Sequence, residues 1–411
     1  MDLDAGNTAW VLVSTALVVF MTPGLALFYG GMVRSKNTLG MLMQNVWCMG
    51  LVSILWALFC YSLAFGGSGG GVIGNFDFVG LKDMQGGMYD DIPLLAFMAF
   101  QMTFAIITPA LVSGAVADRM RFGAWAWFVG LWVVLVYTPV AKWIFGGGWL
   151  AERGALDFAG GTVVHINAGA AALVAVIILG KRHGWPKEPM LPHSLPLTLI
   201  GTGILWFGWF GFNAGSALAA DGVAAQALVN THLAAAAAML GWLLFERVRT
   251  GHATTLGAMS GAVAGLVAIT PCAGFVGGVS PIIIGFLAGA LCYFAVSIKF
   301  RFGYDDSLDV VGIHLVGGIV GSVLLGFFAD AAVNPRGADG VFFGSGGWGL
   351  LGEQVLAVVV VMAFSAAVTA VILLAIRAVL PGGIRVSPDD ESQGLDVTQH
   401  SENAYSFSER G

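Results

Sequence analysis

Charged side chains are scarce in this sequence. Aspartate, glutamate, lysine and arginine make up 10% of its 411 residues, whereas a soluble domain usually carries about 25%. The formal net charge is −6, and no stretch is strongly basic, so the composition argues against a nucleic-acid partner. A chain with so few charges is not expected to cover itself with a water-soluble surface.

Patterns for metal and nucleotide sites are missing as well. The sequence has neither a glycine-rich phosphate-binding loop nor a helical His-Glu-x-x-His pattern. Its four cysteines lie singly in apolar runs without metal-ligand spacing, which is typical of buried free thiols. They are Cys48, Cys60, Cys272 and Cys292. We therefore expect no metal, no cofactor and no enzyme activity.

Long apolar runs are abundant instead. Hydrophobic residues account for 57% of the chain, and eleven segments reach the length of about 20 residues needed to cross a bilayer. The segments lie near 8–32, 40–65, 93–117, 122–145, 162–180, 195–219, 224–246, 253–275, 277–299, 309–329 and 347–380. The sequence predicts an all-α integral membrane protein with eleven transmembrane helices.

The distribution of basic residues predicts how the chain is oriented. With the N-terminus outside, 14 of the 18 lysines and arginines fall on the cytoplasmic side, as the positive-inside rule requires. The acidic start, Met1 to Asp4, lacks the basic region of a secretory signal. We expect a retained first span, an external N-terminus and a cytoplasmic C-terminus.

A weak internal repeat suggests two related halves. Ile107-Thr108-Pro109 in the third span recurs as Ile269-Thr270-Pro271 in the eighth. Repeats offset by five spans must be inverted in the membrane. The prediction is a 5+5 inverted repeat, about 8–180 and 195–329, with an extra helix at 347–380.

Two further expectations concern the organisation of the chain. Residues 1–380 are predicted to form the membrane domain, and 381–411 a polar cytoplasmic tail. Spans 1 and 6 are predicted to be interrupted, as in many transporters. The interruptions are expected at Thr22-Pro23-Gly24 and at Gly208, Gly211 and Gly215.

Two glycine-rich spans each carry a histidine. Read as a helix, residues 157, 161, 165 and 169 share one face that carries Asp157, His165 and two glycines. His314 lies on a similar face with Gly317, Gly318 and Gly321. Glycines allow close helix packing, and an ionisable group within a span normally faces the protein interior. We expect the two imidazoles to meet in a narrow pore at mid-membrane.

The chemistry of these groups leaves alternatives open. An apolar pore excludes a bare cation far more strongly than a small neutral molecule, and imidazole can donate, accept or carry a proton near neutral pH. Each histidine could instead be a satisfied interhelical hydrogen-bonding group. Asp309 is expected to cap its helix, whereas Asp157 is either a cap or a group for cation attraction or proton transfer.

Aromatic residues gather in spans 3 and 6, within 100–104 and 205–216. An aromatic cage with a hydroxyl can hold a small cation by cation–π attraction, worth about 2 kcal/mol when desolvated. Ordinary aromatic packing or an interfacial belt is the alternative.

Several motifs resemble the Amt/Mep/Rh ammonium transporters, in their bacterial Amt branch, and the likeness runs from the first span to the tail. The motifs are Asp157-Phe-Ala-Gly-Gly-Thr-Val-Val-His165, Trp209-Phe-Gly-Phe-Asn-Ala-Gly-Ser216, Asp305-Asp-Ser-Leu-Asp309 through His314, Gly394-Leu-Asp-Val397 and Glu402-Asn-Ala-Tyr405. The resemblance implies a homotrimer with one pore per subunit, an external ammonium site, a phenylalanine gate and a twin-histidine pore.

Carried over residue by residue, the resemblance implies a role for each of eight positions. They are Phe104 and Phe212 for the gate, Trp209, Ser216, Phe104 and Phe145 for ammonium recruitment, His165 and His314 for the pore, and Asp157 for deprotonation or architecture. Phe145 departs from the family, which often has tryptophan there, so cation binding is expected to be weaker.

The function implied is ammonium transport across a bacterial cytoplasmic membrane, with methylammonium as an analogue. Ammonium is expected to be recruited outside and deprotonated, and ammonia to be conducted past the histidines, with or without a proton relay. An electroneutral channel for ammonia or carbon dioxide and an ammonium sensor are the alternatives. The tail resembles a regulatory tail that contacts neighbouring subunits, and the cytoplasmic face is expected to bind a PII-type signalling protein.

Overall fold

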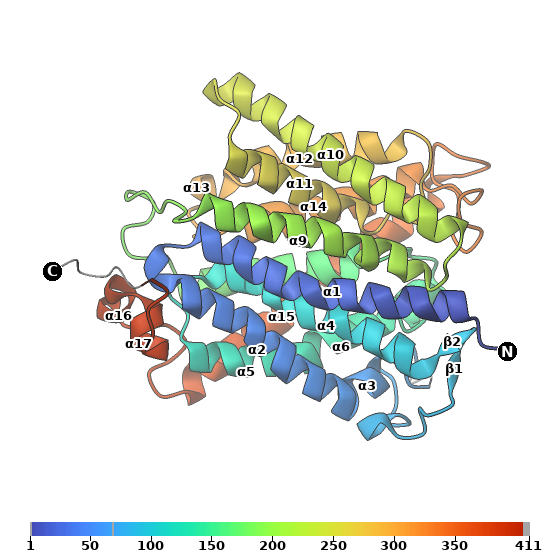
Figure 1. Cartoon of the computed structure of the whole chain (residues 1–411), viewed down its shortest axis with the longest axis horizontal. Helices are drawn as coiled ribbons and strands as arrows, with labels where there is room; N and C mark the ends of the chain where they lie inside the picture. The colour runs from blue at the N-terminus through green and yellow to red at the C-terminus, as the bar shows by residue number, and fades with distance from the viewer. Residues whose placement is uncertain (1, 68–69, 406–411) are drawn as a thin grey trace.

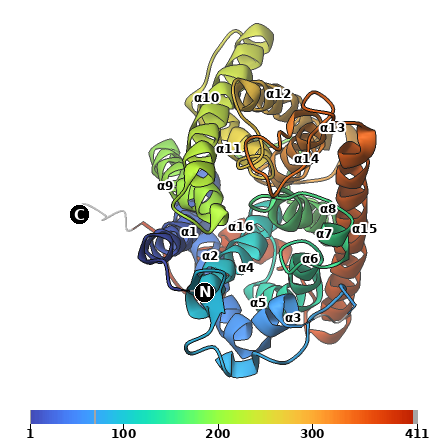
Figure 2. The same ribbon diagram turned by 90° about the vertical axis from the view of Figure 1, so that its right-hand side faces the viewer.

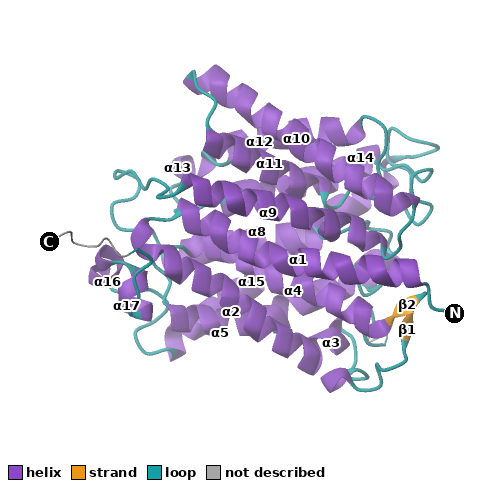
Figure 3. Cartoon of the chain, viewed as in Figure 1, coloured by secondary structure: helices purple, strands orange, loops and turns teal. Residues whose placement is uncertain are grey.

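The computed structural model describes residues 2–67 and 70–405, which form one bundle of long helices (Figures 1 and 3). Within these residues, ten helical segments are long and apolar enough to cross a membrane, and an eleventh, Thr255–Ile269, is apolar but shorter. The prediction of an all-α membrane protein is thereby confirmed, and the predicted count of eleven agrees with ten such segments plus this shorter helix.

The helices follow one another in the order expected from the apolar segments. The α-helices are α1 Ala5–Met32, α2 Thr38–Leu55, α3 Tyr61–Phe65, α4 Leu94–Val116, α5 Phe122–Trp132, α6 Thr138–Trp143, α7 Trp149–Glu152, α8 Asn167–Leu179, α9 Leu195–Ala214, α10 Gly222–Thr250, α11 Thr255–Ile269, α12 Ser280–Ala295, α13 Ile298–Phe302, α14 Val316–Phe328, α15 Trp348–Val379, α16 Pro388–Gln393 and α17 Leu395–His400. A two-stranded hairpin, β1 Met88–Tyr89 and β2 Ile92–Pro93, lies before α4.

Shorter turns connect or begin several of these helices. The 3₁₀ turns are η1 Ser35–Asn37, η3 Val79–Leu81 and η6 Gly215–Ala217. The π-helical segments are η2 Trp56–Cys60, η4 Val133–Tyr137, η5 Gly161–Ile166 and η7 Val311–Leu315. The last two contain the histidines of the fifth and tenth spans.

The start of α1 and the C-terminal helices α16 and α17 lie at opposite ends of the bundle (Figure 1), as an odd number of crossings requires. We call these ends the N-terminal face and the C-terminal face. Figure 2 looks onto the N-terminal face and shows α10 and α15 on different flanks of the bundle.

The interruptions predicted at Pro23, Gly208 and Gly211 are wrong, whereas α9 does end before Gly215, which begins the turn η6. α1 continues through Pro23, and α9 is helical through Gly208 and Gly211. These glycines lie where α9 packs on α1, since a Cβ at Gly208 would approach Met21 Cγ to 2.2 Å and one at Gly211 would approach Leu17 Cβ to 2.7 Å. Their role is close helix packing, which a sequence pattern alone does not distinguish from a break.

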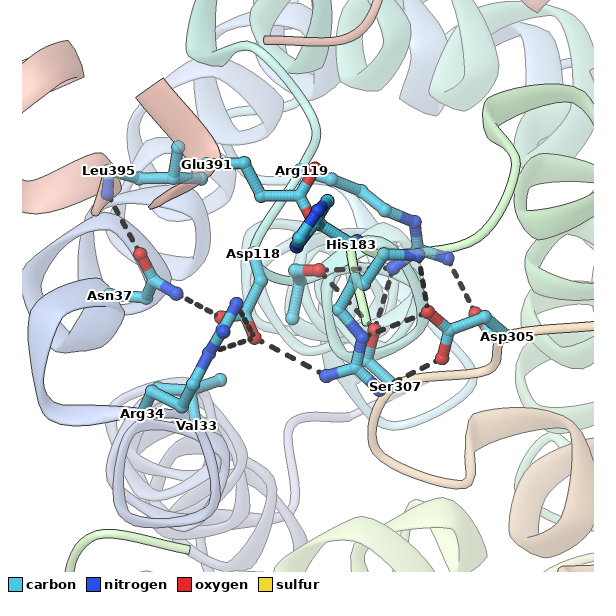
Figure 4. Close-up of polar contacts among 12 residues, drawn as sticks. Val33, Arg34, Asn37, Asp118, Arg119, His183, Asp305, Ser307, Glu391 and Leu395 are labelled. Atoms are coloured by element: carbon cyan, nitrogen blue, oxygen red, sulfur yellow. Dashed lines mark hydrogen bonds and ion pairs between the residues drawn. The ribbon is translucent and has the colours of Figure 1, made fainter. Parts of the chain in front are cut away.

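The described part of the tail packs against the C-terminal face of its own chain. The Glu391 carboxylate is buried, accepts from the His183 backbone N–H at 2.7 Å and pairs with Arg385 at 2.7 Å. Asn37 connects the tail to the bundle, because its Oδ1 accepts from the Leu395 backbone N–H and its Nδ2 donates to Asp118 (Figure 4). Residues 384–400 of the predicted polar tail therefore form a docked segment, and residues 406–411 lie outside the described chain.

A buried ion-pair network continues from Asp118 (Figure 4). Arg182 pairs with Asp118 at 3.3 Å and with Asp305 at 2.8 Å. Burial by itself would raise the pKa of Asp305, but hydrogen bonding and charge from Arg182 hold it below its usual value. This network ties the loops after α4, α8 and α13 together at the C-terminal face.

Candidate functional site

The two predicted histidines face each other in the middle of the bundle. His165 Nδ1 lies 3.3 Å from His314 Nδ1, the ring centroids are 5.3 Å apart, and both residues are buried. Only one of the two Nδ1 atoms can carry a proton if they share a hydrogen bond. The pair is therefore most simply two neutral imidazoles, one donating to the other.

Close packing of the fifth and tenth spans brings the imidazoles together. A Cβ at Gly169 would lie 2.5 Å from the Leu315 backbone nitrogen, and one at Gly318 would lie 2.9 Å from Ile166 Cγ1. Each histidine also sits in a π-helical turn, which rotates the side chain relative to an α-helix of the same sequence. The glycine faces predicted from the sequence are thus the contact surface between these spans.

Asp157 caps the fifth span. Its carboxylate accepts four backbone N–H bonds of 2.7–3.0 Å, two at each oxygen. The donors are Gly160, Gly161, Thr162 and Val163. Asp157 therefore lies before the helix, and the interpretation of 157, 161, 165 and 169 as one continuous helical face is wrong, because Gly160 adopts a φ of 116° at this point.

The equivalent cap in the tenth span is Asp306, not Asp309. Asp306 accepts from the backbone N–H groups of Val310 at 3.1 Å and Val311 at 2.7 Å. Asp309 has a φ of 64° and pairs with Lys299 at 2.6 Å, which corrects the prediction that it caps the helix. The equivalence of the two caps is visible in the sequence, since Asp157 and Asp306 each precede the histidine of their span by eight residues.

Phe104 and Phe212 lie in contact above the histidines, towards the N-terminal face. Their ring centroids are 4.3 Å apart at an interplanar angle of 36°, and each side chain is 1% exposed. Phe212 also lies 6.1 Å from the ring of His165. The two rings separate an outer pocket from an inner cavity.

The outer pocket has a volume of about 110 Å³. It is lined by Tyr89, Phe97, Gln101, Phe104, Phe145, Phe158, Ser216 and Leu218. Ser216 Oγ donates to the Phe212 carbonyl at 2.8 Å, so its lone pairs remain available for a donor in the pocket. Phe145 meets Phe104 edge-on at 6.2 Å. Ser216, Phe104 and Phe145 are thus brought together as the sequence suggested.

Trp209, which was expected to take part in recruitment, does not line the outer pocket. Its ring stacks near His165 at 5.4 Å and its Nε1 donates to Thr270 Oγ1 at 2.9 Å. It lines the inner cavity rather than the outer pocket. Thr270 belongs to the repeated Ile-Thr-Pro motif, and its hydroxyl holds the indole in place, a role that the repeat by itself does not indicate.

The inner cavity is small and almost wholly apolar, with a volume of about 10 Å³. That is roughly the room one water molecule needs. Its lining consists of Met21, Leu25, Phe28, Ile107, Leu111, Val164, His165, Leu205, Trp209, Phe212, Val263 and His314. His165 Nε2 is buried there and has no hydrogen-bond partner among the described residues, so a polar group is available to a small molecule that enters.

A third pocket of about 260 Å³ opens at the C-terminal face, and Arg34, Arg182, Lys299 and Asp309 contribute to its lining. Asp306 lies nearby, and burial raises its pKa to about 6, although the charge of Lys299 opposes this. Outer pocket, phenylalanine pair, inner cavity and this third pocket follow one another between the two faces of the bundle.

Residues 9–405 match the sequence model of the Ammonium Transporter Family. The chain belongs to this family. It is 50% identical to an ammonium transporter of Bacillus subtilis, over 98% of this chain and 99% of the relative. The predicted resemblance to the Amt/Mep/Rh transporters is confirmed.

Solved structures of the Ammonium Transporter Family share the fold. Mep2 of Candida albicans covers 95% of this chain and 88% of its own, with 38% identity and a TM-score of 0.89. A structure described as a sensor Amt protein covers 96% of this chain and 98% of its own, with 29% identity and a TM-score of 0.88. The chain is therefore a multi-pass membrane protein of this family.

Proposed function

We propose that this protein transports ammonium across a bacterial cytoplasmic membrane, as ammonia through the twin-histidine cavity. The observation that carries the proposal is the pair of facing imidazoles in a cavity with room for about one water molecule. A hydrated cation does not fit there, and a bare cation meets a large desolvation cost in apolar surroundings. Ammonia, which is neutral and has one hydrogen-bond acceptor and three donors, is small enough for the cavity and can form a hydrogen bond with the free His165 Nε2.

Recruitment is assigned to the outer pocket. Ammonium is held by the Ser216 hydroxyl and by the faces of Phe104 and Phe145, with Phe212 completing the gate beneath. Trp209 acts one step further in, because it lines the cavity beside His165. Ammonium gives up its proton to water in the outer pocket, and ammonia then passes the phenylalanine pair.

Asp157 serves mainly to build the pore. All four of the hydrogen bonds its carboxylate accepts come from the first backbone N–H groups of the fifth span, so it has little capacity left to accept a substrate proton. It acts on transport through the position of His165. A proton relay, where one operates, runs through the shared Nδ1 hydrogen bond of the two histidines.

A current measurement tests whether charge crosses with the substrate. The protein is reconstituted into proteoliposomes and exposed to an ammonium pulse at several pH values. We expect uptake with an inward current, because the imidazole pair provides a path for the separated proton. Uptake without current favours the electroneutral channel for ammonia or carbon dioxide. Absence of uptake, with ammonium binding retained, favours the sensor function. This alternative is included because a solved structure described as a sensor Amt protein is 29% identical to this chain.

The orientation and assembly belong to the same proposal. Residues 1–380 form the transport domain, the N-terminal face is external, and 381–411 form a cytoplasmic tail. The chain acts as a homotrimer with one pore per subunit, in which the tail also contacts neighbouring subunits. A PII-type signalling protein binds at the cytoplasmic face, where the third pocket opens.

Replacing Phe145 with tryptophan should strengthen recruitment. Tryptophan has the strongest cation–π face and adds an indole donor, and a gain of roughly 0.5–1 kcal/mol at a partly exposed site corresponds to a two- to fivefold lower concentration for half-maximal uptake. Methylammonium uptake measured over a concentration series checks this. Phe65→Trp, at an aromatic residue outside the outer pocket, is the control; an equal shift in both variants would contradict the assignment.

A further inference from the structure

We infer that the groove between α5 and α15 is a binding site for an anionic phospholipid of the leaflet at the C-terminal face. The groove has a volume of about 400 Å³ and is lined by Trp127, Leu131, Ala375, Ile376, Val379, Leu380 and Pro381. Trp127 is 62% exposed and Val379 is 82% exposed. Large apolar side chains thus surround a hollow on the outside of the bundle, where α15 runs along one flank (Figure 2).

The depth of the groove suits one lipid leaflet. From Arg121 at the start of α5 to Leu131 is ten residues, or about 15 Å along a helix. This is roughly half of a hydrocarbon core about 30 Å thick. The groove therefore begins at the membrane surface and ends near the midplane, as the binding site of an acyl chain must.

Positive charge lies at the surface end of the groove. Arg121 Nη1 donates to the carbonyl of Pro381 at 2.6 Å, and Pro381 itself lines the groove. Arg377 lies in the last turn of α15 and is exposed. Neither arginine forms an ion pair within the described residues, although Arg34, Arg182 and Arg385 at the same face all do.

The charge and the groove together define the ligand. Arginine binds phosphate oxygens through its planar fork of donors, and basic residues beside transmembrane helices on this side of a membrane recognise anionic head groups. A zwitterionic lipid could fill the groove but would gain less from the two guanidinium groups. The occupant is therefore a phospholipid with net negative charge, its phosphate at Arg121 and Arg377 and one chain along Trp127 and Val379.

Photolabelling in vesicles tests this site. The whole protein is reconstituted in phosphatidylcholine containing a trace of phosphatidylglycerol with a photoactivatable acyl chain, and labelled peptides are mapped by mass spectrometry. We expect label on α5 and on the last turns of α15. A photoactivatable phosphatidylcholine should label these peptides several-fold less.

Two variants separate the charge from the groove. Arg121→Gln with Arg377→Gln should reduce anionic labelling about 10- to 30-fold, whereas Arg247→Gln with Arg249→Gln, at the end of α10, should leave it unchanged. Ala375→Trp fills the groove, keeps both arginines, and should abolish labelling by either lipid. Equal labelling by both lipids, unchanged labelling in the first variant, or competition by soluble glycerol phosphate as strong as by the lipid would overturn the inference.

Discussion

Replacing both pore histidines by leucine, His165→Leu with His314→Leu, should slow methylammonium uptake by about 100-fold or more. Leucine preserves apolar packing but removes the donor and acceptor that a polar molecule meets in the cavity. Two lost hydrogen bonds of about 1–1.5 kcal/mol each correspond to roughly a hundredfold in rate. Uptake into proteoliposomes, normalised to the amount of reconstituted protein, measures the effect.

The histidine variant needs a control that separates the pore from general damage. His252 lies exposed at the C-terminal face, between α10 and α11, so His252→Leu should transport at the normal rate. The double variant should still elute as the same oligomer as the unmodified protein. Normal uptake by an intact double variant would exclude the twin-histidine cavity as the route.

Asp157→Ala should have the largest effect on stability of the substitutions considered. It leaves four backbone N–H groups in the first turn of the fifth span without their acceptor. Hydrogen bonds to a charged group contribute about 1.5–3 kcal/mol each, and partial replacement by water limits the total. We expect a fall of about 3–5 kcal/mol in the free energy of unfolding, followed in detergent by thermal unfolding.

A simpler helix cap provides the comparison for Asp157. Asp221 accepts from the Ala224 backbone N–H at 2.9 Å at the exposed start of α10, so Asp221→Ala should cost about 1 kcal/mol. Asp157→Asn keeps one acceptor oxygen and should fall between the two. If Asp157→Asn were as stable as the unmodified protein yet lost transport, a direct role of the carboxylate in proton transfer would replace the capping role.

The corrections share a physical cause. Asp309 looked like the helix cap because it stands directly before the apolar run, but its pairing with Lys299 leaves that role to Asp306. Gly208 and Gly211 looked like breaks, but they are points of close contact with α1. In both cases a residue's local preference is compatible with two structures, and the neighbour supplied by the fold selects one.

The sequence by itself determined the class of protein, the spans, the family and the identity of the facing histidines. Bilayer thickness fixes the length of an apolar run. Two ionisable residues on glycine-rich faces of membrane spans are expected to face the protein interior, because exposure to lipid is costly. Only the tertiary structure decided that Trp209 lies inside the gate and Asp306 is the second cap, and that the tail docks through Asn37 and Glu391. Those outcomes depend on contacts between residues far apart in the chain, which no local pattern records.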